Sequence, residues 1–166
     1  MNQPIDRPLD EAADPAHDRF VDRMGQLLES DGFTRTAGRI FGLLLLTPGA
    51  LSLEDLAVAL QASRGAVSQE TRALEKLGAL ERVSRPGDRR VYYEVSDRMH
   101  ERMLELRVQR FEFTREALRD GLKAEAARHP RVRRRMEGLD SFFAVMLESI
   151  RQTREEWHVQ RGEGAE

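Results

Sequence analysis

The sequence predicts a mainly α-helical fold that carries one small β-hairpin, and three observations support this. Apolar residues recur at spacings of three and four over most of the chain, which is the periodicity of helices packed on one side. Between residues 80 and 95 the period changes to the alternation of strands, around a Pro-Gly-Asp turn. The last segment repeats its apolar residues as heptads, a pattern typical of paired helices.

The chain has 166 residues, enough for one hydrophobic core or for one core and a dimer interface. Its formal net charge is −2, but the charges are unevenly distributed. Residues 1–31 hold eight acids and three bases, residues 61–95 hold seven bases and five acids, and residues 128–135 hold five arginines. A near-neutral chain with this distribution can still present a basic surface to nucleic acid.

Composition and motifs exclude several classes of function. The chain has no cysteine, which excludes disulfides, a cysteine nucleophile and a thiolate metal site. Its four histidines do not pair at helical spacings, so we expect no metal and no cofactor. Without a nucleophile elbow or a phosphate-binding loop, we do not expect an enzyme. The polar N-terminus and the short apolar runs predict neither a signal peptide nor a membrane span.

The first hundred residues begin with a predicted flexible arm over residues 1–13, which holds prolines and acids. Asp14-Pro15 then predicts the cap and first turn of a helix that ends near residue 32, with Phe20 and Met24 on one face. A second helix is expected from about Thr36 to Leu46. Because it is apolar all round, we expect it to be buried. Gly38 and Gly42, four residues apart, would allow another helix to approach closely.

A helix-turn-helix is predicted next. Ser52-Leu-Glu-Asp55 is a capping-box-like start for a helix of about eight residues, and a turn at residues 61–62 leads into a second helix over residues 63–77. Val67, Thr71 and Leu74 form the inner face of that second helix. Two short helices joined by so tight a turn, the second with a polar outer face, are typical of a helix-turn-helix.

The outer face of the 63–77 helix carries hydroxyls, an amide and cations, which suit phosphates and base edges in a major groove. The residues predicted to contact DNA are Ser63, Arg64, Gly65, Ser68, Gln69, Arg72 and Lys76. We expect Ser68, Gln69 and Arg72 to face bases, and Arg64 and Lys76 to contact phosphates. A face of this kind is often only solvated, so the neighbouring segments matter for the interpretation.

A β-hairpin follows the second helix. We expect strands over Leu80–Arg85 and Arg90–Val95, with Val91, Tyr93 and Val95 on one side. Arg85, Arg89 and Arg90 lie at its tip, and we expect Arg89, with Arg90, to enter a minor groove. A hairpin directly after the second helix defines a winged helix-turn-helix. The alternative is a winged-helix module for protein contacts, which an acidic outer face on residues 63–77 would have favoured.

Two longer helices complete the chain. The first is expected over about residues 98–128, capped by Asp97, with one apolar stripe that includes Phe113 and another that includes Phe111, hence with two partners. After Pro130, a coiled-coil-like seam runs through Val132, Met136, Leu139, Phe143, Met146, Ile150 and Trp157. A lone chain would leave this seam exposed, so we expect a homodimer. The methionines and phenylalanines fit core or dimer packing, and also the lining of an effector pocket.

These motifs resemble a known family. The run Gly38-Arg-Ile-Phe-Gly-Leu-Leu-Leu-Leu46 resembles the buried second helix of the GbsR-like branch of MarR-type transcriptional regulators. The segments Ser63–Ser68, Arg72–Leu74 and Pro86–Glu94 resemble that branch's recognition helix and wing. The resemblance covers about residues 15–157.

The resemblance implies a cytoplasmic homodimer that binds a pseudo-palindromic operator in double-stranded DNA. It implies that the first and last helices form the dimer, which adds Phe20 and Met24 to the predicted dimerisation residues. It also implies repression, released by a small-molecule effector in the cleft between the DNA-binding and dimer regions. One member of the branch is linked to choline and glycine betaine metabolism. That ligand is not carried over, because Trp157 and Tyr92 lie far apart in the chain and no clear aromatic cage is visible.

The predicted fold class is therefore mainly α with a small β-hairpin wing: a winged helix-turn-helix flanked by dimerisation helices. The predicted segments are a flexible arm (1–13), an N-terminal dimerisation helix (14–32), the winged helix-turn-helix (33–96), a helical dimerisation region (97–157) and a flexible tail (158–166).

Overall fold

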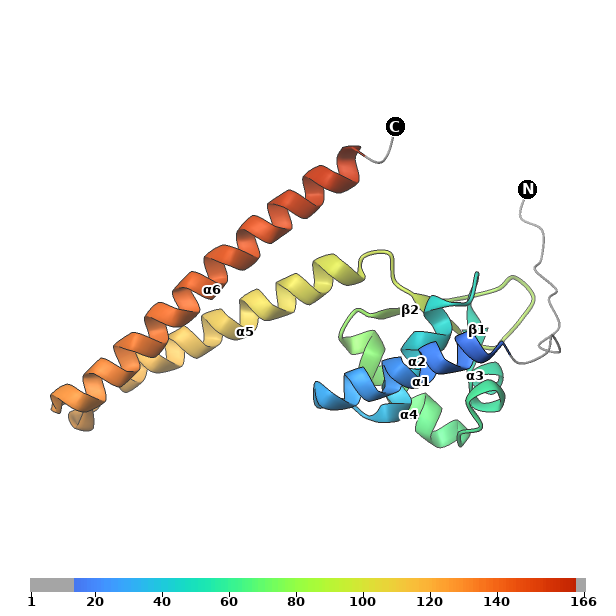
Figure 1. Cartoon of the computed structure of the whole chain (residues 1–166), viewed down its shortest axis with the longest axis horizontal. Helices are drawn as coiled ribbons and strands as arrows, with labels where there is room; N and C mark the ends of the chain where they lie inside the picture. The colour runs from blue at the N-terminus through green and yellow to red at the C-terminus, as the bar shows by residue number, and fades with distance from the viewer. Residues whose placement is uncertain (1–13, 164–166) are drawn as a thin grey trace. The chain divides into compact units, whose positions relative to one another are not determined.

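The computed structural model describes residues 14–163, and the chain divides into two compact units. The first ends at Met99 and the second begins at His100. The first unit contains α1 (Pro15–Ser30), α2 (Arg35–Leu45), β1 (Leu51–Ser52), α3 (Leu53–Leu60), α4 (Arg64–Lys76), β2 (Leu80–Val83) and β3 (Tyr92–Val95) (Figure 1). The remaining elements are α5 (Met99–Gly121), the 3-10 helix η1 (Glu125–Arg128) and α6 (Pro130–Glu163). The predicted mainly α-helical fold with a small β-hairpin is confirmed, and the role of the flanking helices in a dimer stays a prediction. The arm predicted over residues 1–13 lies outside the described residues.

The helices of the first unit begin where the sequence places polar caps. The Asp14 carboxylate accepts a hydrogen bond from the Ala16 N–H (2.9 Å), and the Ser63 hydroxyl accepts one from the Ala66 N–H (3.2 Å). At the start of α3, Ser52 and Asp55 form the predicted capping box, in which each side chain accepts from the other residue's N–H. These side chains satisfy N–H groups that have no partner within their own helix.

Helix α1 packs closely along α2, as Figure 1 shows. A Cβ added at Gly38 would collide with the Met24 carbonyl oxygen, and one at Gly42 would lie 2.8 Å from the Met24 Cβ. The close approach predicted from these two glycines is therefore confirmed. Met24, predicted to lie in a dimer interface, packs against α2 of its own chain.

The core of the first unit forms between α2, α3 and α4. Ile40, Leu56 and Val67 each have 0% of their surface exposed. The expectation that the second helix is buried on all sides is wrong at its C-terminal end, where Leu45 and Leu46 are each 43% exposed. Core packing covers the side of the helix that holds Ile40 and does not extend to these two leucines.

The sheet has three antiparallel strands in the order β1-β3-β2. Sequence reasoning missed β1, whose two residues pair with Tyr93 and Tyr92 of the central strand. Both strands of the hairpin are shorter than predicted. The expected alternation is also wrong at one end, because Val91 precedes β3 and is 41% exposed while Tyr92 is buried.

In the second unit, α5 and α6 run side by side. The rings of Phe111 and Phe143 lie 5.1 Å apart, and Arg115 forms a two-pronged ion pair with Asp140 (2.7 and 3.1 Å). The first long helix ends at Gly121 rather than near residue 128. A Cβ at Gly121 would collide with the Met136 side chain, so α6 approaches α5 closely at this glycine. Helix α6 continues to Glu163, beyond the predicted end at Trp157.

Much of the predicted heptad seam faces α5 of the same chain. Met136 lies against Gly121, Phe143 against Phe111, and the Trp157 ring 4.8 Å from that of His100. The expectation that a lone chain would leave the whole seam exposed is therefore wrong. Leu139, however, is 44% exposed, and the neighbouring Phe142 and Val145 are 55% and 65% exposed. The predicted role of the seam in a dimer stays a prediction.

Candidate nucleic-acid interface

Helix α4 has the two unlike faces predicted from its sequence. Val67 and Thr71 are fully buried and Leu74 is 2% exposed, so the inner face is fixed in the core. The outer residues Arg64, Gly65, Gln69, Arg72 and Lys76 are exposed, whereas Ser68 is exposed only in part. Sequence reasoning did not single out Glu70, a carboxylic acid side chain that is buried.

Two cations of the outer face already have partners on the chain. The Arg72 guanidinium folds back along the helix, donating from Nη2 to the Ser68 hydroxyl (2.7 Å) and from Nε to the Ser68 carbonyl oxygen (3.1 Å). Arg64 forms an exposed ion pair with Glu54 at 3.2 Å. Because exposed pairs of this kind contribute little free energy, both cations can exchange them for an external anion or acceptor.

The other outer side chains are free. Within residues 14–163, neither Gln69 nor Lys76 makes a side-chain hydrogen bond or an ion pair. A Cβ added at Gly65 would meet no atom within 4 Å. The packing of this chain therefore does not require a glycine at that position, and the first turn of α4 is open to an approaching group.

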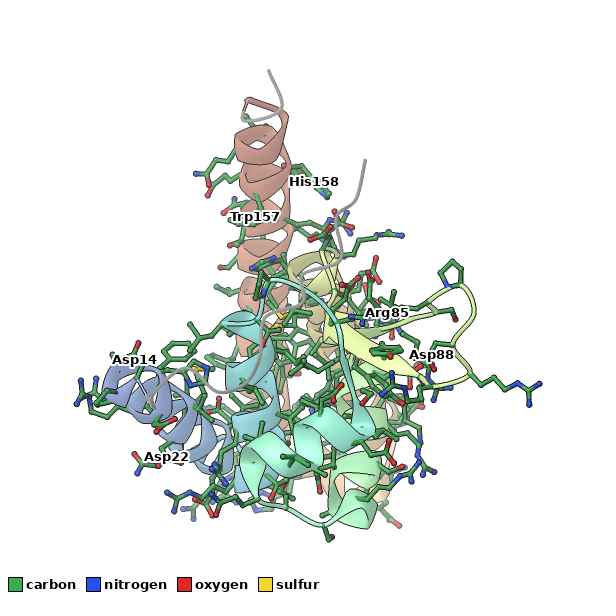
Figure 2. The ribbon with its side chains drawn as sticks, turned by 90° about the vertical axis from the view of Figure 1, so that its right-hand side faces the viewer. Asp14, Asp22, Arg85, Asp88, Trp157 and His158 are labelled. Carbon is green, nitrogen blue, oxygen red and sulfur yellow. The ribbon has the colours of Figure 1, made fainter. Side chains whose placement is uncertain are left out.

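The hairpin is held together by one of the arginines predicted at its tip. The Arg85 guanidinium lies over the ring of Tyr92, 4.0 Å from its centroid, and donates a hydrogen bond to the Ala50 carbonyl oxygen (2.8 Å). Figure 2 shows Arg85 and Asp88 on the hairpin between β2 and β3. This contact joins the hairpin to the segment before β1 and helps to explain why Tyr92 is buried.

Asp88 organises the turn of the hairpin. Its Oδ2 accepts hydrogen bonds from Arg90 Nη2 (2.7 Å) and from the Tyr92 hydroxyl (2.6 Å). The hydrogen bond from Arg90, followed by that from Tyr92, holds the pKa of Asp88 well below its ordinary value. Donation to Asp88 in turn raises the pKa of Tyr92 above its ordinary value. Gly87 supplies the left-handed backbone of the turn, with φ at 82°.

Arg89 differs from its neighbours. It is exposed, and its side chain has no hydrogen bond or ion pair with any other residue in the described part of the chain. Of the three arginines predicted at the tip, Arg85 and Arg90 are engaged in the hairpin itself, whereas Arg89 is available. Asp88, two residues before Arg90, was the sequence signal that could have distinguished Arg90 from Arg89.

Between residues 14 and 163, no group of three or more histidines and acids is placed to hold a metal ion. None of the helices in this range combines the length and the apolar character needed to cross a bilayer. A core between α2, α3 and α4, a polar recognition-type face on α4 and a three-stranded sheet with its hairpin define a winged helix-turn-helix protein.

Comparisons with known proteins agree with this class. A family model described as the MarR family matches residues 31–91. The crystal structure of a transcriptional regulator is 31% identical with a TM-score of 0.77, and the match covers 87% of this chain and 99% of that one. The chain belongs to the MarR family of transcriptional regulators.

Two curated relatives are similar over part of their length. The HTH-type transcriptional regulator MmpR5 of Mycobacterium tuberculosis is 45% identical over 82 residues, which are 49% of this chain and 50% of that protein. YvaV of Bacillus subtilis, a putative HTH-type transcriptional regulator by name, is 26% identical over 91 residues, 55% of this chain and 51% of that protein. The chain thus spans about half the length of the curated relatives it matches.

Proposed function

We propose that this protein binds a pseudo-palindromic operator in double-stranded DNA as a homodimer and represses transcription, within the GbsR-like branch of the MarR family. The observation that carries the proposal is the outer face of α4. It presents Gln69 and Lys76 without partners in the described part of the chain, and Arg72 held only by an exposed contact with Ser68. The face has no large apolar side chain that would favour a protein partner.

The proposed base readers are Gln69 and Arg72, with Ser68 beside them. A glutamine amide matches the paired acceptor and donor of adenine, and an arginine matches the two acceptors of guanine in the major groove. Lys76 and Arg64 supply charge for phosphates. Arg64 reaches them by leaving Glu54, an exchange that costs little because the pair is exposed.

The proposed wing contact depends on Arg89. Arg85 and Arg90 hold the hairpin in shape through Tyr92 and Asp88, so Arg89 is presented on an ordered support. A minor groove offers mainly its width and its negative potential, which a free guanidinium can read. Arg89 therefore adds affinity with little choice of sequence.

The proposed dimer rests on exposed apolar side chains of the second unit. Phe113 of α5 is 73% exposed. On α6, Leu139 of the predicted seam and the neighbouring Phe142 and Val145 are exposed as well. Burying each such side chain stabilises an interface by about 1.5–3 kcal/mol. Since Phe111 faces α6 of the same chain, the stripe with Phe113 is the one left for a second copy.

A small-molecule effector completes the proposal. Two recognition helices must lie about 34 Å apart to reach successive turns of one DNA face. A ligand that favours another spacing by about 1–3 kcal/mol would lower operator affinity roughly 5- to 150-fold. The sequence has no cysteine, so release in this proposal does not depend on oxidation of a thiol of this chain.

The test is a fluorescence anisotropy titration of the full-length protein with overlapping duplexes from the region upstream of its own gene. A scrambled duplex of equal length and composition is the control. One upstream duplex should bind far more tightly than the scrambled one. Equal binding to all duplexes, or none, would favour the rival interpretation of a winged-helix module for protein contacts.

A further inference from the structure

Arg39 of α2 connects two elements that are separate in sequence. Its Nε lies 3.1 Å from an Asp22 carboxylate oxygen on α1, and its Nη1 donates a hydrogen bond to the Leu60 carbonyl oxygen at the end of α3 (3.1 Å). Figure 2 shows Asp22 on α1. The guanidinium thus spans from the first helix to the last residue before the turn of the helix-turn-helix.

The path of Arg39 past α1 depends on a small residue. Gly25 is buried, and a Cβ added there would lie 2.8 Å from the Arg39 Cγ. The aliphatic stem of Arg39 therefore occupies the space that a side chain at position 25 would fill. Any larger residue at 25 would have to displace the stem, so the contact is built into the packing of α1 on α2.

The contact of Arg39 with Leu60 lies at the end of α3, where the backbone makes a strained turn. Gln61 has a left-handed backbone with φ at 51°, the sole non-glycine residue between 14 and 163 with a positive φ. The N–H groups of Gln61 and Ala62 return to the Val58 and Ala57 carbonyls, and Arg39 takes the Leu60 carbonyl. A cation at the carbonyl end of a helix also complements the helix dipole.

Such a backbone conformation persists only where its surroundings hold it in place. Only Gln61 and Ala62 separate Leu60 from Ser63, which caps α4. A change in the direction of the Leu60 peptide is therefore transmitted directly to the start of the recognition-type helix. Arg39 is a side chain that fixes this peptide from outside the helix-turn-helix.

We propose that Arg39 is a positioning residue that sets the start of α4 from α1. A displacement of α1 then changes the DNA-binding face although Arg39 and Asp22 lie on neither α4 nor the hairpin. The inference rests on the proposed function for its DNA readout. It adds a mechanism by which a shift of α1 changes the DNA binding of α4.

The two contacts of Arg39 differ in character. The side chains of Arg39 and Asp22 are 34% and 53% exposed, so solvent screens their attraction. The buried Arg39 Nε has no well-aligned acceptor among residues 14–163, because the approach to Asp22 is an ion pair without hydrogen-bond geometry. The bond to Leu60 is the directional contact, and Asp22 serves to keep the guanidinium over it.

The test compares the full-length variants Arg39→Met, Arg39→Lys and Asp22→Asn with Arg23→Met. Arg23 is an exposed arginine on α1 with no side-chain partner in the described part of the chain, and it is the matched control. Three quantities are measured: global stability in urea, amide hydrogen exchange of the segment 57–66, and affinity for the upstream duplex.

Arg39→Met should accelerate exchange in the segment 57–66 more than in the core of α2. It should also weaken DNA binding roughly 2- to 30-fold under conditions in which the variant is folded. Arg39→Lys, whose ammonium can reach Leu60, should recover part of both effects. Asp22→Asn should give a smaller change in the same direction, and Arg23→Met should change neither quantity.

The proposal is overturned if Arg39→Met accelerates exchange uniformly over the first unit, because that is the result of a role in global stability alone. It is also overturned if the variant binds DNA as tightly as the original chain. If the original chain binds no DNA, the proposed function fails, and local exchange at 57–66 still decides whether Arg39 positions the turn.

Discussion

The Tyr92 hydroxyl donates a hydrogen bond of 2.6 Å to the carboxylate of Asp88, which lies four residues earlier in the turn of the hairpin. Arg85 covers the ring of the same tyrosine. Tyr92 thus links the base of the hairpin to its turn and, together with Arg90, orders the turn that carries Arg89.

This bond makes the hairpin sensitive to alkaline pH. Since the folded pKa of Tyr92 is raised by donation to Asp88, its contribution to stability is present below the unfolded pKa of about 10 and is lost as the pH rises through the folded pKa. The chain has two tyrosines. In an ultraviolet titration, one tyrosine should ionise above the ordinary range.

Asp88→Asn is the matching variant, because it removes the carboxylate charge and keeps the size of the side chain. It should bring the late tyrosine back toward its ordinary pKa. An unchanged titration curve in this variant would show that Asp88 does not govern Tyr92.

Mutations in the recognition helix and in the wing should affect DNA binding in different ways. Removing one base contact through Gln69→Ala or Arg72→Ala should cost about 1–3 kcal/mol and relax the preference at one base position per half-site. Arg89→Ala should weaken binding to operator and scrambled DNA alike. A variant that makes one phosphate contact fewer should have a log–log salt slope shallower by about 0.9.

The measurement is DNA binding of the three variants at several salt concentrations, with each variant's fold checked by circular dichroism. The assigned roles would be reversed if Arg89→Ala altered base preference while Arg72→Ala weakened all binding equally. Arg85→Ala is a useful comparison, since it should lower stability as well as affinity by releasing Tyr92.

Gly65→Ala should change the stability of the protein and its affinity for operator DNA in opposite directions. An added Cβ meets nothing within 4 Å, and alanine is favoured over glycine inside a helix by roughly 0.5–1 kcal/mol. The variant should therefore be more stable in urea. It should also bind operator DNA less well, because the methyl group occupies the space through which a phosphate approaches the first turn of α4.

Ala73→Gly, an exposed position in the same helix, is the control for helix propensity. It should lower stability by a similar amount with less effect on binding. A Gly65→Ala protein that is more stable and binds DNA normally would mean that the glycine does not serve the interface.

Phe142→Glu should break the proposed dimer. The residue is 55% exposed on α6, so a single chain tolerates the charge, whereas burying it between two copies costs several kcal/mol. Light scattering should show a monomer at concentrations where the original chain is a dimer. Val58→Glu, at a 71% exposed position on α3, is the control and should leave the oligomeric state unchanged.

Features set by local chemistry could be predicted from the sequence. The caps at Asp14, Ser52 and Ser63 depend on residues two or three positions away, so the sequence contains both partners. The close approach of α1 at Gly38 follows from the absence of a side chain at that position, and this absence is visible in the sequence itself. The inner face of α4 follows from periodicity alone.

Features set by a distant partner could not be predicted. The strand β1 is two residues long and exists because Tyr92 and Tyr93 lie beside it. The heptads of α6 indicate that a helix packs there, but a repeat does not specify whether that helix is α5 of the same chain or a second copy. For the same reason, nothing local to Arg39 indicated that its guanidinium reaches Leu60, 21 residues later.

The contact between Arg72 and Ser68 has a consequence for selectivity on the proposed DNA surface. The unbound helix already satisfies its own arginine, so DNA must offer a better acceptor than a hydroxyl and a carbonyl four residues away. A guanine edge does so with two acceptors in the plane of the guanidinium, whereas most other edges offer fewer. Every DNA sequence must therefore replace the contact of Arg72 with Ser68 before it gains from this arginine. This lowers the affinity for all DNA and increases the ratio of operator affinity to non-operator affinity.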